Sequence, residues 1–124
     1  GAGGVFRVRP DGSGFEILHQ CGSVVDDARE PAVGLTRLPD GSLLGVSMAG
    51  GTANLGAIFR MEPGGGGYQV LHHFTGGTLD GARGRSRLTP GSRGLCFGAT
   101  LNGGAGNLGT AFALIPVAEG TAGR

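Results

Sequence analysis

Residues 41–63 read GSLLGVSMAGGTANLGAIFRMEP, and this stretch decides the fold. Two short apolar runs, residues 43–48 and 57–61, have the composition of β-strands. A glycine-rich connection, residues 50–56 (GGTANLG), joins them. Glycine and asparagine tolerate the positive φ angles that reverse a chain between antiparallel strands. The stretch therefore predicts a β-hairpin.

The same pattern returns 53 residues later, where residues 94–116 read GLCFGATLNGGAGNLGTAFALIP. Its second half also occurs near the start, where residues 3–10 read GGVFRVRP. Phe6, Phe59 and Phe112 align at this offset. We therefore predict a single repeat domain over residues 1–124, with repeat units 3–55 and 56–108, a partial third unit 109–116 and a C-terminal tail 117–124.

Composition excludes several classes of protein. Of the 124 residues, 29 are glycine, but the apolar residues keep a fixed register within the repeat, which disordered tracts do not. We interpret the glycines as turn residues. The net charge of +1 gives no electrostatic support for binding nucleic acid. No run of 18 apolar residues occurs, so the chain is not expected to span a membrane.

Each unit offers four short strands separated by turns, and no segment has a convincing helical period. In the first unit these strands are predicted at residues 4–9, 15–20, 31–38 and 43–48. Four strands in about 50 residues, repeated in tandem, are typical of a β-propeller blade. The sequence thus predicts an all-β fold, a partial β-propeller of about two four-stranded antiparallel blades. The alternative is a β-solenoid.

Several fragments in the same order resemble a known family, the Gloeo-Verruco (GloVer) tandem repeat of bacterial proteins. They are GGVFRVRPDG from Gly3, PDGSLLGVSMAGG from Pro39, LHHFTGG from Leu71 and LDGARGRSRL from Leu79. The resemblance covers nearly the whole chain. It implies an exported or cell-envelope protein, propeller-like, from a family with no assigned chemistry.

Analogy with related propeller repeats also implies an order of strands within a blade. The innermost strand would open at Pro31 or Gly84, the second at Leu43 or Leu95, and the third at Ala57 or Thr110. The outermost would be residues 15–20 or 68–73. Only one blade is then complete, and a propeller needs at least four. We expect the chain to assemble with copies of itself, to pack on another protein or to belong to a longer parent.

Four arginines of the second unit are the most informative anomaly: Arg83, Arg85, Arg87 and Arg93. If residues 84–88 form a strand, the first three project from one face. One repeat earlier, the residues aligned with these three are Glu30, Ala32 and Gly34. Burying unpaired guanidinium groups is unfavourable, so this face is either exposed or meets carboxylates or another anion. The alternative is that the segment is a solvated loop. Our hypothesis is an interface with the acidic surface of a protein partner, through self-association or a hetero-complex.

The two halves of the chain carry net charges of opposite sign, which supports that hypothesis. Residues 1–53 carry four arginines and six acids, giving −2, whereas residues 54–124 carry six arginines and three acids, giving +3. A head-to-tail assembly or a foreign acidic partner could use this complementarity.

Asp27 and Asp80 occupy matching places in the connection to the inner strand. Aspartate in a turn commonly accepts hydrogen bonds from backbone N–H groups, so we interpret both as loop-structuring residues. Calcium binding is the alternative, but one carboxylate per loop supplies too few oxygens. His19 and His72 are also repeat equivalents, and we interpret them as structural rather than as metal ligands.

Neither the cysteines nor the glycine loops predict chemistry. Cys21 and Cys96 each replace an apolar residue of the other unit, which favours free buried thiols over a disulfide. The loops at Gly50 and Gly103 lack the lysine and hydroxyl residue of a phosphate-binding loop. We expect no catalytic residue, metal or cofactor, and a structural or protein-interaction module within a larger assembly. The alternative is a ligand-binding or hydrolytic propeller whose site forms only in a ring completed by further chains.

Overall fold

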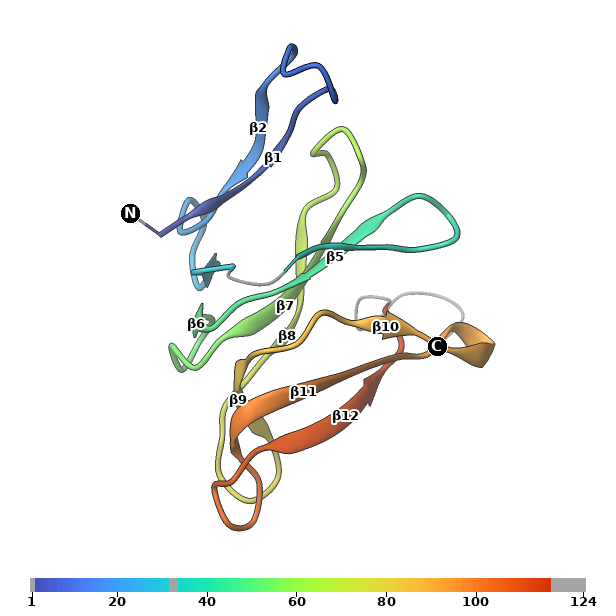
Figure 1. Cartoon of the computed structure of the whole chain (residues 1–124). Coiled ribbons are helices and arrows are strands. Elements are labelled where there is room, and N and C mark those ends of the chain that lie inside the picture. The colour runs from blue at the N-terminus through green and yellow to red at the C-terminus, as the bar shows by residue number, and fades with distance from the viewer. Residues whose placement is uncertain (1, 32–33, 117–124) are drawn as a thin grey trace.

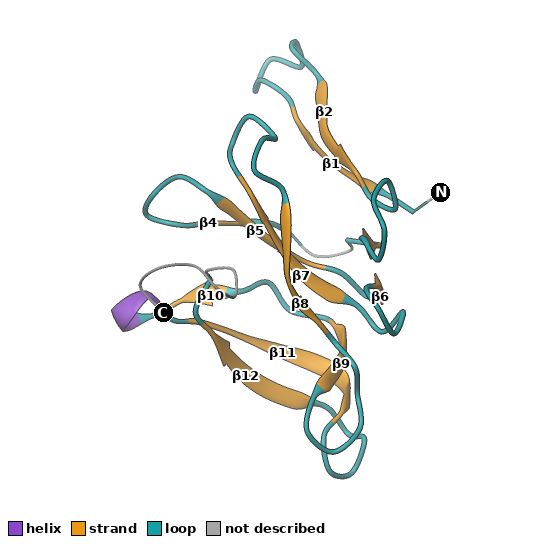
Figure 2. Cartoon of the chain, turned by 180° about the vertical axis from the view of Figure 1, so that it is seen from behind, coloured by secondary structure: helices purple, strands orange, loops and turns teal. Residues whose placement is uncertain are grey.

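The structure, a computed structural model, describes residues 2–31 and 34–116. The chain is all-β, with several antiparallel sheets of two to four strands, none of them closed, an architecture consistent with a partial propeller or a solenoid (Figures 1 and 2). The helical content of the described residues is one 3-10 turn, η1 (Ser92–Gly94). This agrees with the predicted fold class.

Three parts follow one another through the molecule (Figure 1). The N-terminal hairpin consists of β1 (Gly4–Arg7) and β2 (Glu16–Gln20). The central sheet has the order β4 (Thr36–Arg37), β5 (Leu43–Val46), β7 (Ala57–Met61) and β8 (Gln69–His73). In the C-terminal sheet, β11 (Cys96–Gly103) pairs with β12 (Thr110–Leu114) on one side and with β9 (Gly81–Gly84) and β10 (Thr89–Pro90) on the other. A short pair, β3 (Ala28–Arg29) with β6 (Ala49–Gly50), stands beside the hairpin and the central sheet.

The predicted hairpin of residues 41–63 is β5 and β7, the middle pair of the central sheet. Gly45 stands directly opposite Phe59, and the phenyl ring occupies the space that a Cβ on residue 45 would fill. Gly98 and Phe112 repeat this arrangement between β11 and β12. A glycine at this place therefore lets a large ring lie across its own sheet. The order of the four strands is the one that the propeller analogy implied.

Two predicted strands are shorter or displaced. The strand predicted at residues 31–38 is reduced to Thr36–Arg37, and Pro31 has no N–H to donate to a ladder; residues 32–33 lie outside the described residues. Residues 85–88, predicted within a strand at 84–88, form none. Here Ala99 N–H donates to the Ser86 hydroxyl oxygen at 2.9 Å instead of to a backbone carbonyl, which interrupts the ladder between β9 and β10.

The core consists of two apolar clusters, one on each face of the central sheet. Side chains of β7 alternate between them: Ile58 belongs to the cluster shared with the C-terminal sheet, and Phe59 to the cluster shared with the hairpin. The first cluster also holds Phe74, Leu88 from the segment before β10, and Cys96 from β11. Because both faces of the central sheet are covered, its strands show the weak polar alternation seen in the sequence.

Candidate functional site

The four arginines of the predicted partner interface are all exposed on the C-terminal unit. No ion pair joins any of them to a carboxylate among the described residues. Arg83 lies within β9 and has a φ of 61°, and its N–H donates to Leu55 O at 2.6 Å instead of to β11. The guanidinium of Arg87 lies against Gly34, the residue that aligns with it one unit earlier. All four side chains are therefore exposed, and Arg85 and Arg87 stand on an irregular segment rather than on one face of a strand.

Asp27 is a buried carboxylate at the junction of the hairpin and the central sheet, with 2% of its surface exposed. Its Oδ2 accepts a hydrogen bond from His19 Nε2 at 2.8 Å and from the backbone N–H of Gly22 at 2.9 Å and of Ser23 at 3.2 Å. Its Oδ1 accepts from the N–H of Ala28 at 2.8 Å and from the Tyr68 hydroxyl. Tyr68 belongs to the next unit, so this carboxylate joins two sheets.

An aromatic stack reinforces the same junction. The rings of His19 and Tyr68 lie parallel, with centroids 3.5 Å apart and an interplanar angle of 12°. Burial alone would raise the pKa of Asp27, but the hydrogen bonds from Tyr68 and His19 outweigh it and lower the pKa. Burial and the hydrogen bond to Asp27 raise the pKa of Tyr68. The carboxylate is therefore charged and the phenol neutral at ordinary pH.

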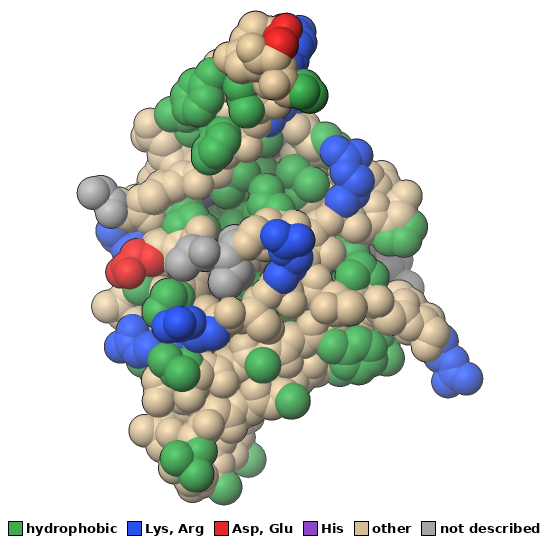
Figure 3. Space-filling model, in the orientation of Figure 1, with side chains coloured by type: hydrophobic (Ala, Val, Ile, Leu, Met, Phe, Trp, Pro, Cys, Tyr) green, Lys and Arg blue, Asp and Glu red, His purple; other side chains and the backbone are tan. Residues whose placement is uncertain are grey.

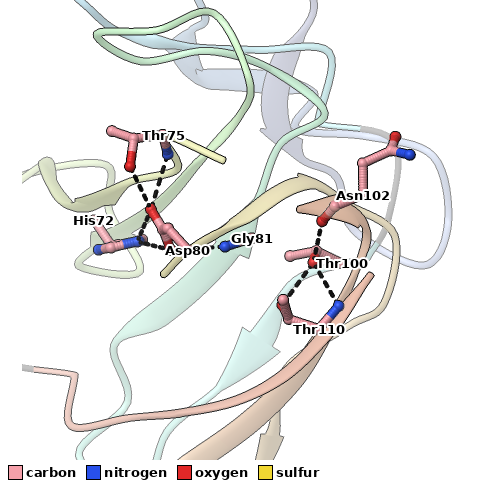
Figure 4. A network of polar contacts seen from close by, with 7 residues as sticks. All are labelled: His72, Thr75, Asp80, Gly81, Thr100, Asn102 and Thr110. Atoms are coloured by element: carbon pink, nitrogen blue, oxygen red, sulfur yellow. Dashed lines mark hydrogen bonds and ion pairs between the residues drawn. The ribbon is translucent and has the colours of Figure 1, made fainter. Parts of the chain in front are cut away.

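Asp80 repeats half of this arrangement (Figure 4). His72 Nε2 lies 3.0 Å from its Oδ1, and the Gly81 N–H donates to the same oxygen at 2.8 Å. Its Oδ2 accepts from Thr75 twice, from the N–H at 2.8 Å and from the hydroxyl at 3.0 Å. Burial would raise the pKa of Asp80, and the hydrogen bonds of Thr75 and His72 lower it. Every one of these partners belongs to the same repeat unit as Asp80.

Sequence analysis identified both aspartates and both histidines but missed their pairing. It interpreted the histidines only as structural, whereas each imidazole bonds a carboxylate eight residues further along the chain. The identical spacing in the two units was the signal that could have revealed it. Tyr68 had no such signal, because the aligned residue of the hairpin is Phe15, which has no hydroxyl group.

The glycine loops use their N–H groups internally. Gly50 N–H donates to Asn54 Oδ1 and Gly103 N–H to Asn107 Oδ1, both at 2.8 Å. Nearby, a hydroxyl closes each loop at its base: Ser47 bonds Ala49 O at 2.9 Å, and Thr100 bonds Asn102 O at 2.9 Å (Figure 4). These internal bonds leave the two glycines unable to cradle a phosphate.

The described part of the chain contains no site suited to a metal ion or to a reactive thiol. It holds no group of three or more side chains suited to a metal ion. Cys21 and Cys96 are free and buried, and burial raises the pKa of the Cys21 thiol to about 11. Such a thiol stays protonated and unreactive. No helix among the described residues has the length and apolarity needed to cross a membrane.

Apolar side chains gather on the outer face of the N-terminal hairpin, at the top of Figure 3. Phe6, Val8, Phe15 and Ile17 are exposed there, and Phe6, Phe15 and Ile17 line a shared hollow. Phe97, Leu101 and Ile115 are exposed at the opposite end of the molecule, in and beside the C-terminal sheet. Exposed apolar patches of this kind mark surfaces that contact other proteins.

Comparison with known proteins agrees with the repeat. The family model described as the Gloeobacter/Verrucomicrobia repeat matches residues 1–122. No curated protein matches the chain, and no solved structure does. Because the match spans nearly the whole chain, this protein belongs to the Gloeobacter/Verrucomicrobia repeat family.

Proposed function

We propose that this chain is a non-enzymatic structural module of propeller-type repeats that binds the acidic surface of a protein partner in a larger assembly. The observation that carries the proposal is the set of exposed arginines on the C-terminal unit, Arg83, Arg85, Arg87 and Arg93. None has a carboxylate partner among the described residues. The resemblance to bacterial repeat proteins supports an exported or cell-envelope location.

The first unit supports this assignment by contrast. The residues aligned with Arg83 and Arg93 are Glu30 and Asp40, both acidic. Arg87 replaces a glycine, and Arg85 replaces an alanine, Ala32, which lies outside the described residues. The same positions of the repeat therefore carry negative or no charge in one unit and positive charge in the next. This change of charge between equivalent positions supports a role for the guanidinium groups in binding.

Arginine suits such a role for a chemical reason. Its planar guanidinium offers five N–H donors in a fork that matches a carboxylate, and it loses less hydration than an ammonium group on contact. Arg85 and Arg87 stand on the irregular segment between β9 and β10, where no described side chain pairs with them. Carboxylates of a partner could reach these two groups without unfolding any strand.

The test is the binding of a fluorescent glutamate-rich peptide, followed by anisotropy at rising ionic strength. We expect the double variant Arg85→Glu/Arg87→Glu to bind at least about tenfold more weakly than wild type and to lose most of the salt dependence. The matched control is Arg9→Glu/Arg37→Glu, which changes net charge equally at two exposed arginines of the first unit. Equal weakening by both pairs, or by neither, would show that the proposed surface has no special role.

A further inference from the structure

The exposed face of the N-terminal hairpin has the composition of a buried interface. Phe6 is 57% exposed and Phe15 62% exposed, but the residues that align with them are Phe59 and Tyr68, in the cluster between the hairpin and the central sheet. Phe59 is fully buried. Val8 and Ile17 align with further members of that cluster, Met61 and Val70.

The exposed face of the hairpin has the same geometry as the covered face of the central sheet. The rings of Phe6 and Phe15 have centroids 5.5 Å apart and an interplanar angle of 32°. The rings of Phe59 and Tyr68 have centroids 5.5 Å apart and an angle of 34°. The same β-bulge precedes the first phenylalanine of each pair, between Val5 and Phe6 and between Ile58 and Phe59. The outer face of the hairpin therefore has the same shape as the Phe59 and Tyr68 face of the central sheet, on which another sheet packs.

The C-terminal sheet exposes the other type of face, the one that in the central sheet is covered by the following sheet. Its outward side chains align with buried residues of the central sheet, Leu44, Val46 and Ile58. Within the chain, Leu44, Val46 and Ile58 are covered by Phe112 and its neighbours from the C-terminal sheet. Their exposed counterparts are Phe97, Ala99 and Ala111.

We propose that the two faces bind each other between molecules. The C-terminal sheet of one copy packs on the N-terminal hairpin of the next, with Phe6 covering Ala111 as Phe112 covers Ile58 within the chain. The proposal rests on the function proposed above, because it names a second copy of this chain as one component of the larger assembly. The chain makes this type of contact twice internally, and its two ends carry the two unused halves.

Face-to-face packing is favoured over pairing of strand edges. The offset of 53 residues places β1 and β12 at the same position of the sheet, beside the second strand. In addition, β2 is already hydrogen-bonded to β1 along its inner edge. Adding β2 to the free side of β12 would require β1 to be stripped away, whereas stacking of the two faces breaks no hydrogen bond.

Such an interface is heterologous, since different surfaces of the two copies meet. Each copy retains one unused half on either side, so association continues until a ring closes or a filament forms. A symmetric dimer through two hairpins would behave differently, because it would stop at two copies. Mass and the effect of mixing variants therefore distinguish the two arrangements.

The experiment uses Phe6→Glu and Ala111→Glu, which place a charge in one face each. Wild type is expected to form a closed oligomer or a longer assembly, measured by light scattering and native mass spectrometry, and each variant is expected to be monomeric. Mixed in equal amounts, the two variants should form a heterodimer through their one intact pair of faces and grow no further. Leu79→Glu is the matched control, since Leu79 is 97% exposed but stands on neither face.

Three outcomes would overturn the proposal: a monomeric wild type, variants that mix without forming a heterodimer, or an effect of Phe6→Glu without one of Ala111→Glu. Circular dichroism checks that each variant is folded. The peptide assay distinguishes this failure from failure of the proposed function. A monomer that still binds the acidic peptide through Arg85 and Arg87 loses only the head-to-tail contact.

Discussion

The two His–Asp pairs occupy the same place in successive units, yet among the described residues only Asp27 also receives a side-chain hydrogen bond from the unit that follows it. Asp27 receives the hydroxyl of Tyr68 from the central sheet, and the tyrosine ring stacks on His19. Asp80 receives instead the hydroxyl of Thr75, five residues away in its own loop. The side chain of Asp27 is fully buried, whereas that of Asp80 keeps 19% of its surface exposed.

The difference teaches how a repeat adapts one polar network to two surroundings. Thr75 aligns with Gly22, and Gly22 can supply only an N–H. Where the next unit supplies a hydroxyl, the loop has a glycine; where the loop supplies its own, it has a threonine. Both carboxylates thus receive a hydroxyl, and they differ in whether a neighbouring sheet is needed to provide it.

The largest expected effect is the contrast between Asp27→Ala and Asp80→Ala. Asp27→Ala removes a fully buried carboxylate and leaves three backbone N–H groups, an imidazole and a phenol without their acceptor, so we expect a loss of about 3–5 kcal/mol in the free energy of unfolding. Water can reach the partners of Asp80, so we expect a loss of about 1–2 kcal/mol there. Urea unfolding followed by circular dichroism measures both. Equal losses would contradict the distinction between a joining and a local network.

The sequence located most of the strands, because one pattern occurs twice, and the analogy with propeller repeats supplied their order within a sheet. It also located both aspartates, since each stands in a turn connection at the same offset. It could not predict that Asp27 meets Tyr68, a contact across 41 residues between different sheets. Periodicity along one strand carries no information about the neighbouring sheet that covers it.

Periodicity also misplaced a strand. Arg83, Arg85 and Arg87 alternate with small or apolar residues, which favoured a strand over residues 84–88. The Ser86 hydroxyl takes the N–H of Ala99 that a strand carbonyl would accept, and the ladder stops. A side chain that competes with the backbone for one hydrogen bond is local chemistry that alternation does not record.

Lowering the pH should reduce the free energy of unfolding less than deleting either carboxylate does, because protonation leaves most of the network in place. The folded-state pKa values of Asp27 and Asp80 are both lowered. Their contributions to stability are therefore complete above the unfolded pKa, about 3.9, and are lost as the pH falls through the folded values. We expect the free energy of unfolding to decline below about pH 4.

The slope of the free energy of unfolding against pH, compared between variants, shows which aspartate causes the decline. Asp27→Ala should flatten the acid limb of a series of urea titrations more than Asp80→Ala does, because Asp27 is the more buried carboxylate. Exposed turn aspartates, Asp11 and Asp40, also have lowered pKa values and contribute the slope that remains in both variants. An acid limb unchanged in Asp27→Ala would mean that this carboxylate does not titrate with unfolding.

The smallest effects test the hydroxyl groups alone. Tyr68→Phe and Thr75→Val each remove one hydroxyl from a carboxylate and keep nearly the same shape. We expect Tyr68→Phe to cost about 1–2 kcal/mol, since a hydrogen bond to a buried charged group is lost, and Thr75→Val about 0.5–1 kcal/mol, since water can replace it. Because the two changes lie at different junctions with no shared partner, the double variant should show the sum of the two losses. A loss larger than the sum would mean that the two junctions are energetically coupled through the central sheet, and the contrast between a joining and a local network would then be too simple.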